Sequence, residues 1–171
     1  TKGIGHDEFK EVRIGPKKVN IPVEWELTNI NEATEKVQYG ISKKMSLDGE
    51  YPIFRMNNFK SGRMVPYPMK YIDLEKEEFE KYKLEKGDIL FNRTNSIDLV
   101  GKNGIFELDG NFVFASYLIR LRTNKIMNPF YLNYYMNSYY AESVFSAVAT
   151  RGASQANINA TNLKSVSVPL P

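Results

Sequence analysis

The chain has 171 residues, 42% of them hydrophobic, which fits one folded domain with a packed core and excludes a wholly disordered chain. It contains no cysteine, which excludes a disulfide framework, a cysteine-based metal site and a cysteine nucleophile, and agrees with a cytoplasmic location. The formal net charge of +3 does not by itself indicate a nucleic-acid partner, but basic segments flank an acidic block at residues 71–90, so locally basic surfaces are available.

Residues 1–20 are polar and charged, and we expect them to form a loosely held lead-in to a single domain that spans residues 21–171. The lead-in lacks the apolar segment of a signal peptide, and no apolar run in the chain is long enough to cross a membrane. Because the sequence lacks an initiator methionine and closes on Val168-Pro169-Leu170-Pro171, we expect it to be a fragment of a longer protein.

The first half of the domain is typical of short strands around one charged helix. Residues 32–37 fit a short helix or a turn. Asp73 is placed to cap a helix over residues 74–82, whose acidic cluster we interpret as a solvated face. Aromatic and β-branched residues bounded by turn residues predict strands at 51–56, 64–67 and 89–91.

The second half begins with predicted strands at residues 104–108, 112–114 and 117–122. Asp109-Gly110 lies between the first two, and this dipeptide favours a tight turn, so we expect those two strands to form a hairpin. The prolines at the end of the chain exclude a helix there, so a strand is expected at 166–168, after a short helix at 158–163.

The longest predicted helix spans residues 129–148. Asn128 is a typical N-cap, Pro129 occupies the first helical position, where its missing N–H costs nothing, and apolar side chains recur at helical spacing. Gly152 is expected to end this helix in a left-handed conformation. These elements predict the α+β class: a curved, mostly antiparallel sheet with one long helix and short helices packed on it.

The usual parts of an active site are missing from the sequence. The only histidine, His6, lies in the lead-in, so zinc-hydrolase and Ser-His arrangements lack their residues. No phosphate-binding loop of the P-loop or dinucleotide type occurs. We therefore expect no catalytic residue, no metal site and no cofactor in this chain.

Loops rich in hydrogen-bonding side chains are the candidate binding sites. The first follows the buried strand at 89–91, and its members are Asn92, Arg93, Thr94, Asn95, Ser96 and, further on, Lys102. Arginine can bind a guanine edge through two hydrogen bonds, asparagine does the same to adenine, and hydroxyl groups suit phosphate oxygens. An ordinary polar loop, whose side chains bond to their own backbone, explains the same composition equally well.

Two further polar segments are candidates for the same surface. One lies at a strand end and its turn, and by itself is more typical of an exposed hairpin tip; its residues are Arg55, Asn57, Asn58, Lys60 and Arg63. The other surrounds Gly152, and a helix end followed by an N-cap at Asn157 also explains it; its residues are Arg151, Ser154 and Gln155. For Arg120 and Arg122, on one face of a strand, we expect a structural or solvent-facing role.

Four stretches of the sequence form an ordered set of motifs. They are residues 21–27 (IPVEWEL), 51–59 (YPIFRMNNF), 84–102 (LEKGDILFNRTNS, then VGK after a gap) and 152–159 (GASQANIN). In this order and at these separations, and with the closing Val-Pro-Leu-Pro, they resemble the target-recognition domains of type I restriction-modification DNA specificity subunits. Each motif alone is common, but the ordered set is fairly specific, and the resemblance covers residues 21–171.

The resemblance implies sequence-specific binding of double-stranded DNA, in which this chain reads one half of a bipartite recognition site. It implies two partners, a methyltransferase (modification) subunit that uses S-adenosylmethionine and a restriction subunit that uses ATP and Mg, with none of these cofactors in this chain. Three alternatives stay open: the recognition domain of a single-chain restriction-methylation enzyme, an enzyme fragment with its own active site, and a protein-interaction domain.

Overall fold

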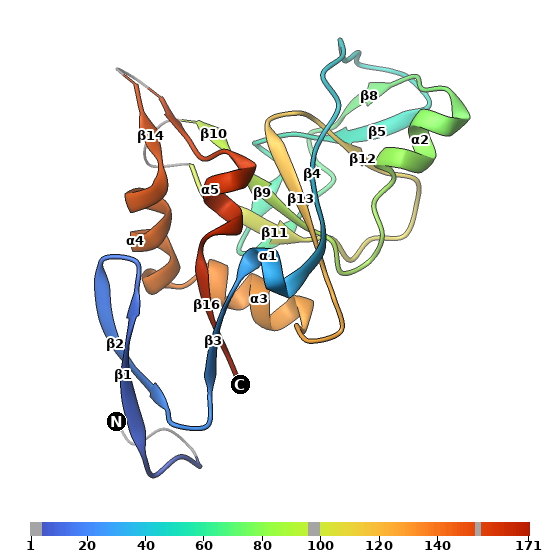
Figure 1. Ribbon diagram of the computed structural model, residues 1–171. Helices are drawn as coiled ribbons and strands as arrows, with labels where there is room; N and C mark the ends of the chain where they lie inside the picture. The colour runs from blue at the N-terminus through green and yellow to red at the C-terminus, as the bar shows by residue number, and fades with distance from the viewer. Residues whose placement is uncertain (1–4, 96–99, 153–154) are drawn as a thin grey trace.

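A six-stranded sheet forms the centre of the molecule in the computed structural model, which describes residues 5–95, 100–152 and 155–171 (Figure 1). The strand order is β4-β13-β9-β11-β7-β6, and neighbouring strands are antiparallel except for β11 and β7. The bounds are β4 Thr34–Tyr39, β13 Leu118–Thr123, β9 Ile89–Asn92, β11 Asn103–Ile105, β7 Arg63–Met64 and β6 Phe59–Lys60. The expected α+β class with a mostly antiparallel sheet is confirmed.

Both faces of this sheet are buried, and strand β9 illustrates it. All four residues of β9 are buried. Because successive side chains of a strand point to opposite faces, Ile89 and Phe91 join one apolar cluster while Leu90 joins another. Burial on both sides explains why this strand appears in the sequence as a continuous apolar run rather than an alternating one.

Helices cover the face to which Ile89 and Phe91 point (Figure 1). They are α3 (Pro129–Met136), α4 (Tyr139–Val148) and α5 (Ala160–Lys164). A short helix α1 (Ile30–Ala33) precedes β4, and β3 (Glu26–Asn29) pairs antiparallel with β16 (Ser167–Leu170). Among the described residues, every helix is too short or too polar to span a membrane.

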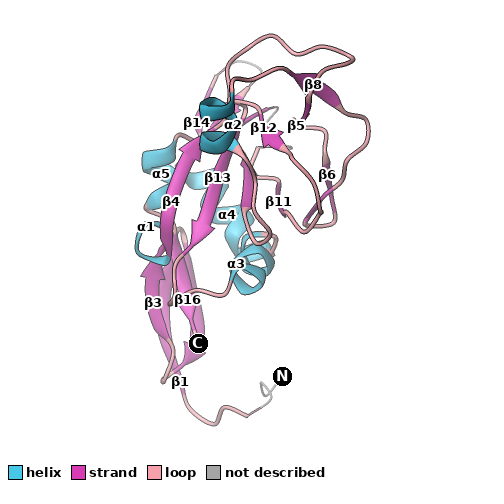
Figure 2. Ribbon diagram, turned by 90° about the vertical axis from the view of Figure 1, so that its right-hand side faces the viewer, coloured by secondary structure: helices cyan, strands magenta, loops and turns pink. Residues whose placement is uncertain are grey.

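A second, smaller sheet and one helix cover the other face. The order is β12-β5-β8, with bounds β12 Val113–Phe114, β5 Tyr51–Phe54 and β8 Lys70–Ile72, and the helix is α2 (Lys76–Tyr82). The rings of Phe54, Phe106 and Phe112 pack together with centroids 5.2 to 5.9 Å apart. Figure 2 shows this lobe at the end of the molecule opposite β1 (Phe9–Ile14).

The hairpin predicted at Asp109-Gly110 is wrong, because the strands on either side belong to different sheets. Strand β11 pairs with β9 and β7, whereas β12 runs parallel to β5. The chain crosses between the sheets because Phe106 and Phe112 both enter the aromatic cluster of the smaller lobe. Their carbonyls also accept hydrogen bonds, at 2.9 Å each, from backbone N–H groups that precede β9. Long-range packing thus overrides a local turn signal.

The single helix predicted at 129–148 is two helices. Helix α3 ends at Met136 and α4 begins at Tyr139. Between them Ser138 has an extended backbone (φ −83°, ψ 157°), and its hydroxyl accepts a hydrogen bond from the Ala141 N–H at 3.4 Å. Serine favours this N-cap geometry over a helix interior, because its short side chain competes for backbone donors. The apolar spacing continues across the break and conceals it in the sequence.

Residues 9–20 of the predicted lead-in are held in a hairpin rather than loosely. Strand β1 pairs antiparallel with β2 (Lys17–Pro22), and the turn lies between Ile14 and Lys17. Gly15 has a φ of +56°, and a Cβ there would lie 2.8 Å from a methyl group of Val144, so both conformation and packing require glycine. Ile14 is buried in the main core. Val12 and Val19 pack against the same core, and the polar composition of the segment concealed this attachment.

Most other predicted elements are present with shifted ends. Of the strand predicted at 64–67, only the first residue is in a strand, β7. Residues 32–37, predicted as a short helix or a turn, contain the end of α1 and the start of β4. Helix α2 begins after Glu75. Asp73 does not cap it, because its carboxylate accepts a hydrogen bond from the Glu50 N–H at 2.8 Å. These shifts arise from contacts between residues that are far apart in the sequence.

Candidate functional site

Three short strands form a small antiparallel sheet, here called the terminal ribbon, beyond the end of β9 (Figure 1). In the order β10-β15-β14 they are β10 (Thr94–Asn95), β15 (Ala156–Asn157) and β14 (Thr150–Arg151). The Gly152 N–H donates to the Gln155 carbonyl at 2.7 Å, and the Ile158 N–H donates to the Arg93 carbonyl at 2.8 Å. The polar segments after β9 and after α4, which the sequence singled out separately, are thereby brought side by side.

Arg93, the first residue beyond β9, is half-buried at the junction of the main sheet and the terminal ribbon. Its Nε donates to the Ser116 carbonyl at 3.0 Å, and its Nη1 donates to the Asn157 Oδ1 at 3.1 Å. The guanidinium carbon also lies 4.9 Å from the centroid of the Tyr39 ring. A guanidinium has five N–H donors, so these two hydrogen bonds do not use all of them. The group is therefore held in place and keeps N–H donors beyond these two hydrogen bonds.

Thr94 and Gln155 are two further predicted contact residues that the structure describes. Thr94 is half-buried and pairs with Asn157, while Gln155 is exposed at the loop between β14 and β15. Gly152 lies in that loop without a left-handed conformation, and α4 ends before it, at Val148, so its predicted role as a helix end is wrong. The predicted residues Ser96 and Ser154 lie outside the described residues, as do the side chains of Asn95 and Arg151.

Two predicted contact residues, Asn58 and Asn92, are 0% exposed, which removes them from a surface site. The Asn58 Oδ1 accepts the Arg55 N–H at 2.9 Å, and its Nδ2 donates to two carbonyls of the following loop at 3.1 Å each. The Asn92 backbone N–H donates to the Lys102 carbonyl at 2.7 Å. Both residues therefore hold loops in place, whereas Lys102 itself is exposed.

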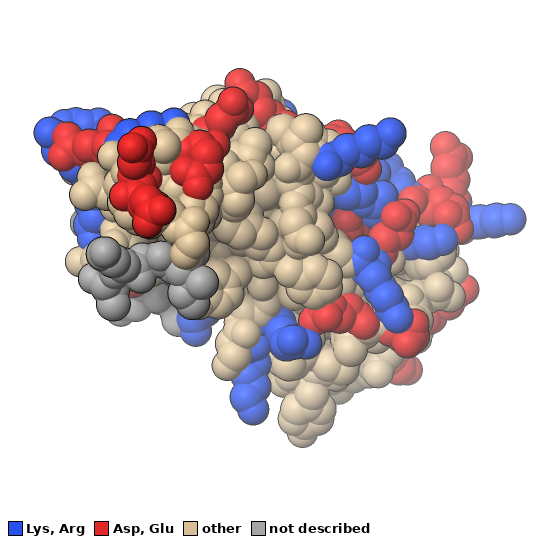
Figure 3. All heavy atoms as spheres, turned by 90° about the horizontal axis from the view of Figure 1, so that it is seen from below, with Lys and Arg blue, Asp and Glu red and all other residues tan. Residues whose placement is uncertain are grey.

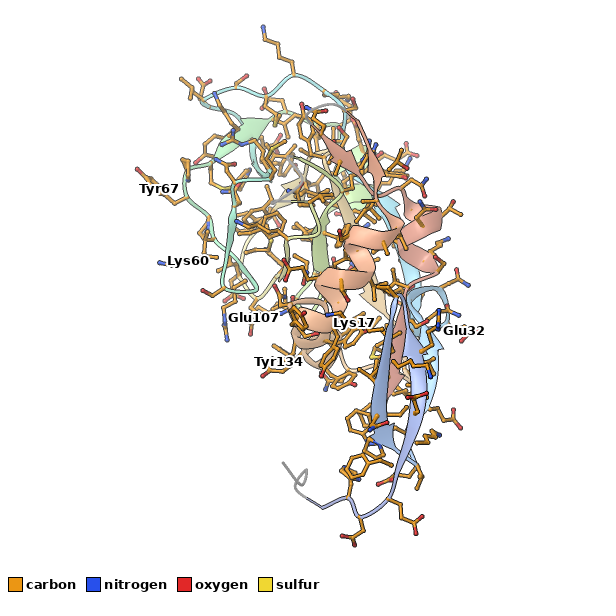
Figure 4. All side chains as sticks on the ribbon, turned by 90° about the vertical axis from the view of Figure 1, so that its left-hand side faces the viewer. Lys17, Glu32, Lys60, Tyr67, Glu107 and Tyr134 are labelled. Atoms are coloured by element: carbon orange, nitrogen blue, oxygen red, sulfur yellow. The ribbon has the colours of Figure 1, made fainter. Side chains whose placement is uncertain are left out.

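The remaining members of the segment at 55–63 lie at the other edge of the main sheet, where β11 separates β7 from β9. Arg63 is exposed but paired with Glu107 at 2.6 Å, and the half-buried Arg55 donates through Nη2 to a loop carbonyl at 3.3 Å. Asn57 and Lys60 are exposed. Figure 4 shows Lys60 and Tyr67 pointing away from the body on the same side. The strand order thus places this segment apart from the terminal ribbon.

Arg120 and Arg122 belong to a buried ion cluster around Asp88. The Arg122 Nε lies 2.7 Å from Asp88 Oδ1, and the Arg120 Nη1 lies 3.5 Å from Asp88 Oδ2. Arg120 also donates to the Lys81 and Lys83 carbonyls, at 3.1 and 2.7 Å. Burial lowers the pKa of Arg120, whereas hydrogen bonds to Asp88 raise the pKa of Arg122. Their role is structural, since they fasten the segment after α2 to the sheet.

Charge distinguishes the faces of the molecule. Helix α2 and its N-cap carry Glu75, Glu77, Glu78 and Glu80, and in Figure 1 they lie at the upper right, away from the terminal ribbon at the upper left. A face of this kind repels phosphate groups. Figure 3 shows that the face seen from below is largely uncharged, with charged side chains at its margins. Neither of these two faces suits a polyanion.

Two partners of Arg93 were missed in the sequence, and a third was misjudged. No local sequence pattern connects Tyr39 or Ser116 with Arg93. They reach Arg93 only because β4 pairs with β13 and β13 pairs with β9. Asn157, which ends the third polar segment, was also interpreted as an N-cap, a role that Asn159 fills by accepting the Asn162 N–H at 2.7 Å. No spacing rule connects positions so far apart in the sequence.

The family model described as the type I restriction modification DNA specificity domain matches residues 22–171. The chain is 32% identical over 169 residues to a putative type I restriction enzyme MjaX specificity subunit of Methanocaldococcus jannaschii. It is 34% identical over 152 residues to the type I restriction enzyme StySPI specificity subunit of Salmonella potsdam. These alignments cover 96% and 86% of this chain but only 39% and 33% of those proteins, so the chain spans little more than a third of their length.

Solved structures show the same fold. The S subunit of a type I restriction-modification system from M. genitalium superposes with a TM-score of 0.59 at 18% identity, covering 92% of this chain and 37% of that one. The HsdS subunit from Thermoanaerobacter tengcongensis gives a TM-score of 0.62 at 21% identity, covering 90% and 34%. At these identities the likeness establishes the fold alone.

Proposed function

This chain belongs to the family of type I restriction modification DNA specificity domains, and from this premise we propose that it binds double-stranded DNA of a defined sequence and reads one half of a bipartite site. The observation that carries the proposal is the terminal ribbon, which adjoins Arg93 and presents Gln155 in the loop between β14 and β15, at one end of the molecule. The major groove is wide enough for a two-stranded β-ribbon, and guanidinium and carboxamide groups bind guanine and adenine edges through paired hydrogen bonds.

Within this proposal, contacts divide into those that read bases and those that hold the duplex. Arg93 and Gln155 are the proposed base contacts. The other residues predicted in these two polar segments are Thr94, Asn95, Ser96, Arg151 and Ser154, and of these the structure describes the side chain of Thr94. The exposed ammonium groups of Lys60 and Lys102 are proposed to contact phosphates, which positions the protein without reading sequence. The acidic helix α2 faces away from the duplex.

We propose that the chemistry lies in partner subunits and that this chain supplies recognition alone. A methyltransferase subunit that uses S-adenosylmethionine would modify a base next to the bound ribbon, and an ATP-dependent restriction subunit would cleave. A methyltransferase has to extrude its target base from the duplex, so the recognition domain need only hold the surrounding sequence in register. Because such an assembly would act on cellular DNA, we propose that the chain is cytoplasmic.

Selection from a library of randomised duplexes on the immobilised chain, at low ionic strength, tests the proposed function. We expect one short contiguous motif to be enriched. Binding of the enriched duplex is expected to weaken as salt is raised, because phosphate contacts release bound counterions. A selected pool that matches the input pool, or binding that is insensitive to salt, would contradict the proposal.

Arg93→Ala then separates base reading from general attraction. Loss of a bidentate base contact is expected to weaken binding to the enriched duplex by about 5- to 150-fold, with a smaller loss on a scrambled duplex. The matched control Lys102→Ala removes a cation proposed to touch only phosphate, and is expected to weaken both duplexes equally. An equal loss on both duplexes for Arg93→Ala would remove Arg93 from base reading.

A further inference from the structure

We infer that Tyr39 is a positioning residue for Arg93, so that strand β4 helps to set the base preference of a ribbon to which it does not belong. The inference rests on the proposed function, because it concerns how Arg93 meets DNA. Tyr39 is the last residue of β4, the edge strand of the main sheet on the side of β13. It contributes no atom to the terminal ribbon itself, whose strands are β10, β15 and β14.

Three segments hold the Arg93 guanidinium from different directions. The turn before β13 provides the Ser116 carbonyl, which accepts from Nε at 3.0 Å. Strand β15 provides the Asn157 side chain, which accepts from Nη1 at 3.1 Å. The ring of Tyr39 provides a flat surface 4.9 Å from the guanidinium carbon, within the range of a cation–π contact. The ring is the one contact of the three that is made through the charged guanidinium carbon rather than through a single N–H group.

Tyr39 is itself fixed. Its backbone pairs with Ile119 of β13, and its hydroxyl accepts a hydrogen bond from the Ala160 N–H at 2.8 Å, at the start of α5. Figure 2 shows α5 beside β4, and the two elements are in contact. The ring is therefore tied to the main sheet at one end and to a helix at the other. Tyr39 is 40% exposed, and Arg93 beside it is half-buried, so the pair lies near the molecular surface.

This arrangement matters because a free arginine side chain has several rotatable bonds. Ordering such a side chain when DNA binds costs conformational entropy, and a group already held in its bound orientation avoids that cost. Two parallel hydrogen bonds to guanine also require the guanidinium plane to lie in the plane of the base. The Tyr39 ring, over which the guanidinium carbon lies, restricts the positions that the group can take. Tyr39 thus acts on discrimination through Arg93.

A purely structural role predicts a different result, and two variants distinguish the roles. Tyr39→Leu removes the ring, while Tyr39→Phe keeps the ring and loses only the hydroxyl that accepts from α5. If Tyr39 only anchored α5, both variants would lower thermal stability and neither would alter base preference. Tyr140→Leu, at a tyrosine of α4 with 48% exposure, is the matched control for losing a half-exposed ring elsewhere.

The test repeats the randomised-duplex selection with each variant and measures the ratio of Kd values for scrambled and enriched duplexes. We expect Tyr39→Leu to reduce this ratio about two- to five-fold, the range of an exposed cation–π contact, at the same base position that Arg93→Ala affects. Tyr39→Phe and Tyr140→Leu are expected to keep the wild-type ratio. Melting temperatures of all four proteins identify any variant that fails to fold.

The outcomes separate this inference from the proposed function. If the wild-type chain selects no motif, the proposed function fails, and the inference fails with it. If the wild-type chain selects a motif and Arg93→Ala loses it, but Tyr39→Leu keeps the full preference, only the inference is overturned. A loss in Tyr39→Phe equal to that in Tyr39→Leu also overturns it, because the hydroxyl rather than the ring would then be responsible.

Discussion

Adjacent asparagines, Asn57 and Asn58, have opposite environments in the turn that follows β5. Asn57 is exposed, whereas Asn58 is 0% exposed and uses its amide on the backbone of its own loop. A sequence motif treats the two alike, since both offer the same hydrogen-bonding groups. Only burial decides that one is available to a ligand and the other holds the loop.

Asn58→Ala is expected to lower the free energy of unfolding by about 1–3 kcal/mol, because it leaves buried backbone donors and acceptors without partners. Asn57→Ala, its exposed neighbour, is the matched control, and we expect a change within about 0.5 kcal/mol. Urea unfolding followed by circular dichroism measures both. Equal stability of the two variants would show that the Asn58 amide does not hold the loop.

Two arginines show how far the site was predictable from the sequence. The polar loop that contains Arg93 was recognised because it follows a continuous apolar strand, a local signal. That Arg120 is 1% exposed, between Asp88 and two backbone carbonyls, follows from packing between distant segments. Local patterns therefore located the candidate loops, but not which of their polar groups remain available.

Helices and strands were predicted correctly where one local sequence pattern dominated. They were predicted wrongly where two local patterns, such as apolar spacing and an N-cap residue, indicated different structures. The buried strand β9 was recognised from its apolar run alone. The long helix was predicted as one element because its apolar spacing persists through Ser138, although that residue caps a new helix. The ribbon strands are two residues each, too short for any periodic pattern, so their pairing was not predictable.

Helix α3 also gives the molecule a pH-dependent attachment. The Tyr131 and Tyr135 hydroxyls donate to the Pro169 and Ser167 carbonyls at 2.8 Å each, which fastens α3 to β16. Burial raises the pKa of Tyr131 to about 12, and burial also raises the pKa of Tyr135. Since an unfolded tyrosine ionises near pH ~10, the unfolded chain loses these protons before the folded chain does.

Below pH ~10 the contribution of these two tyrosines to the free energy of unfolding is therefore expected to be fully retained. This contribution is expected to fall as the pH rises from about 10 to about 12. Tyr131→Phe keeps the ring but has no proton to lose, so its stability should fall less steeply over this range. Tyr134→Phe, at an exposed tyrosine of the same helix, is the control and should match the wild type. Urea unfolding at a series of pH values gives the slopes. Identical slopes in Tyr131→Phe and the wild type would contradict the attachment.

For the whole molecule, the arrangement of charge matters more than its sum. A net charge of +3 is nearly neutral, yet the acidic helix α2 and the terminal ribbon lie on opposite sides in Figure 1. The sequence indicated an acidic block between basic flanks, and the ordered motifs indicated the family. Neither indicated that the second and third polar segments lie apart, because that depends on the strand order of the main sheet.

The central claim is that the terminal ribbon contacts DNA, and the absence of cysteine from the chain allows a direct measurement. Gln155→Cys places a single thiol on the ribbon, and Glu77→Cys places one on the acidic helix. Each variant is incubated with the enriched duplex carrying a thiol tethered to one base, and disulfide cross-links are quantified with and without excess unmodified duplex. We expect Gln155→Cys to cross-link and Glu77→Cys to remain free. Equal or stronger cross-linking through Glu77→Cys would contradict the claim.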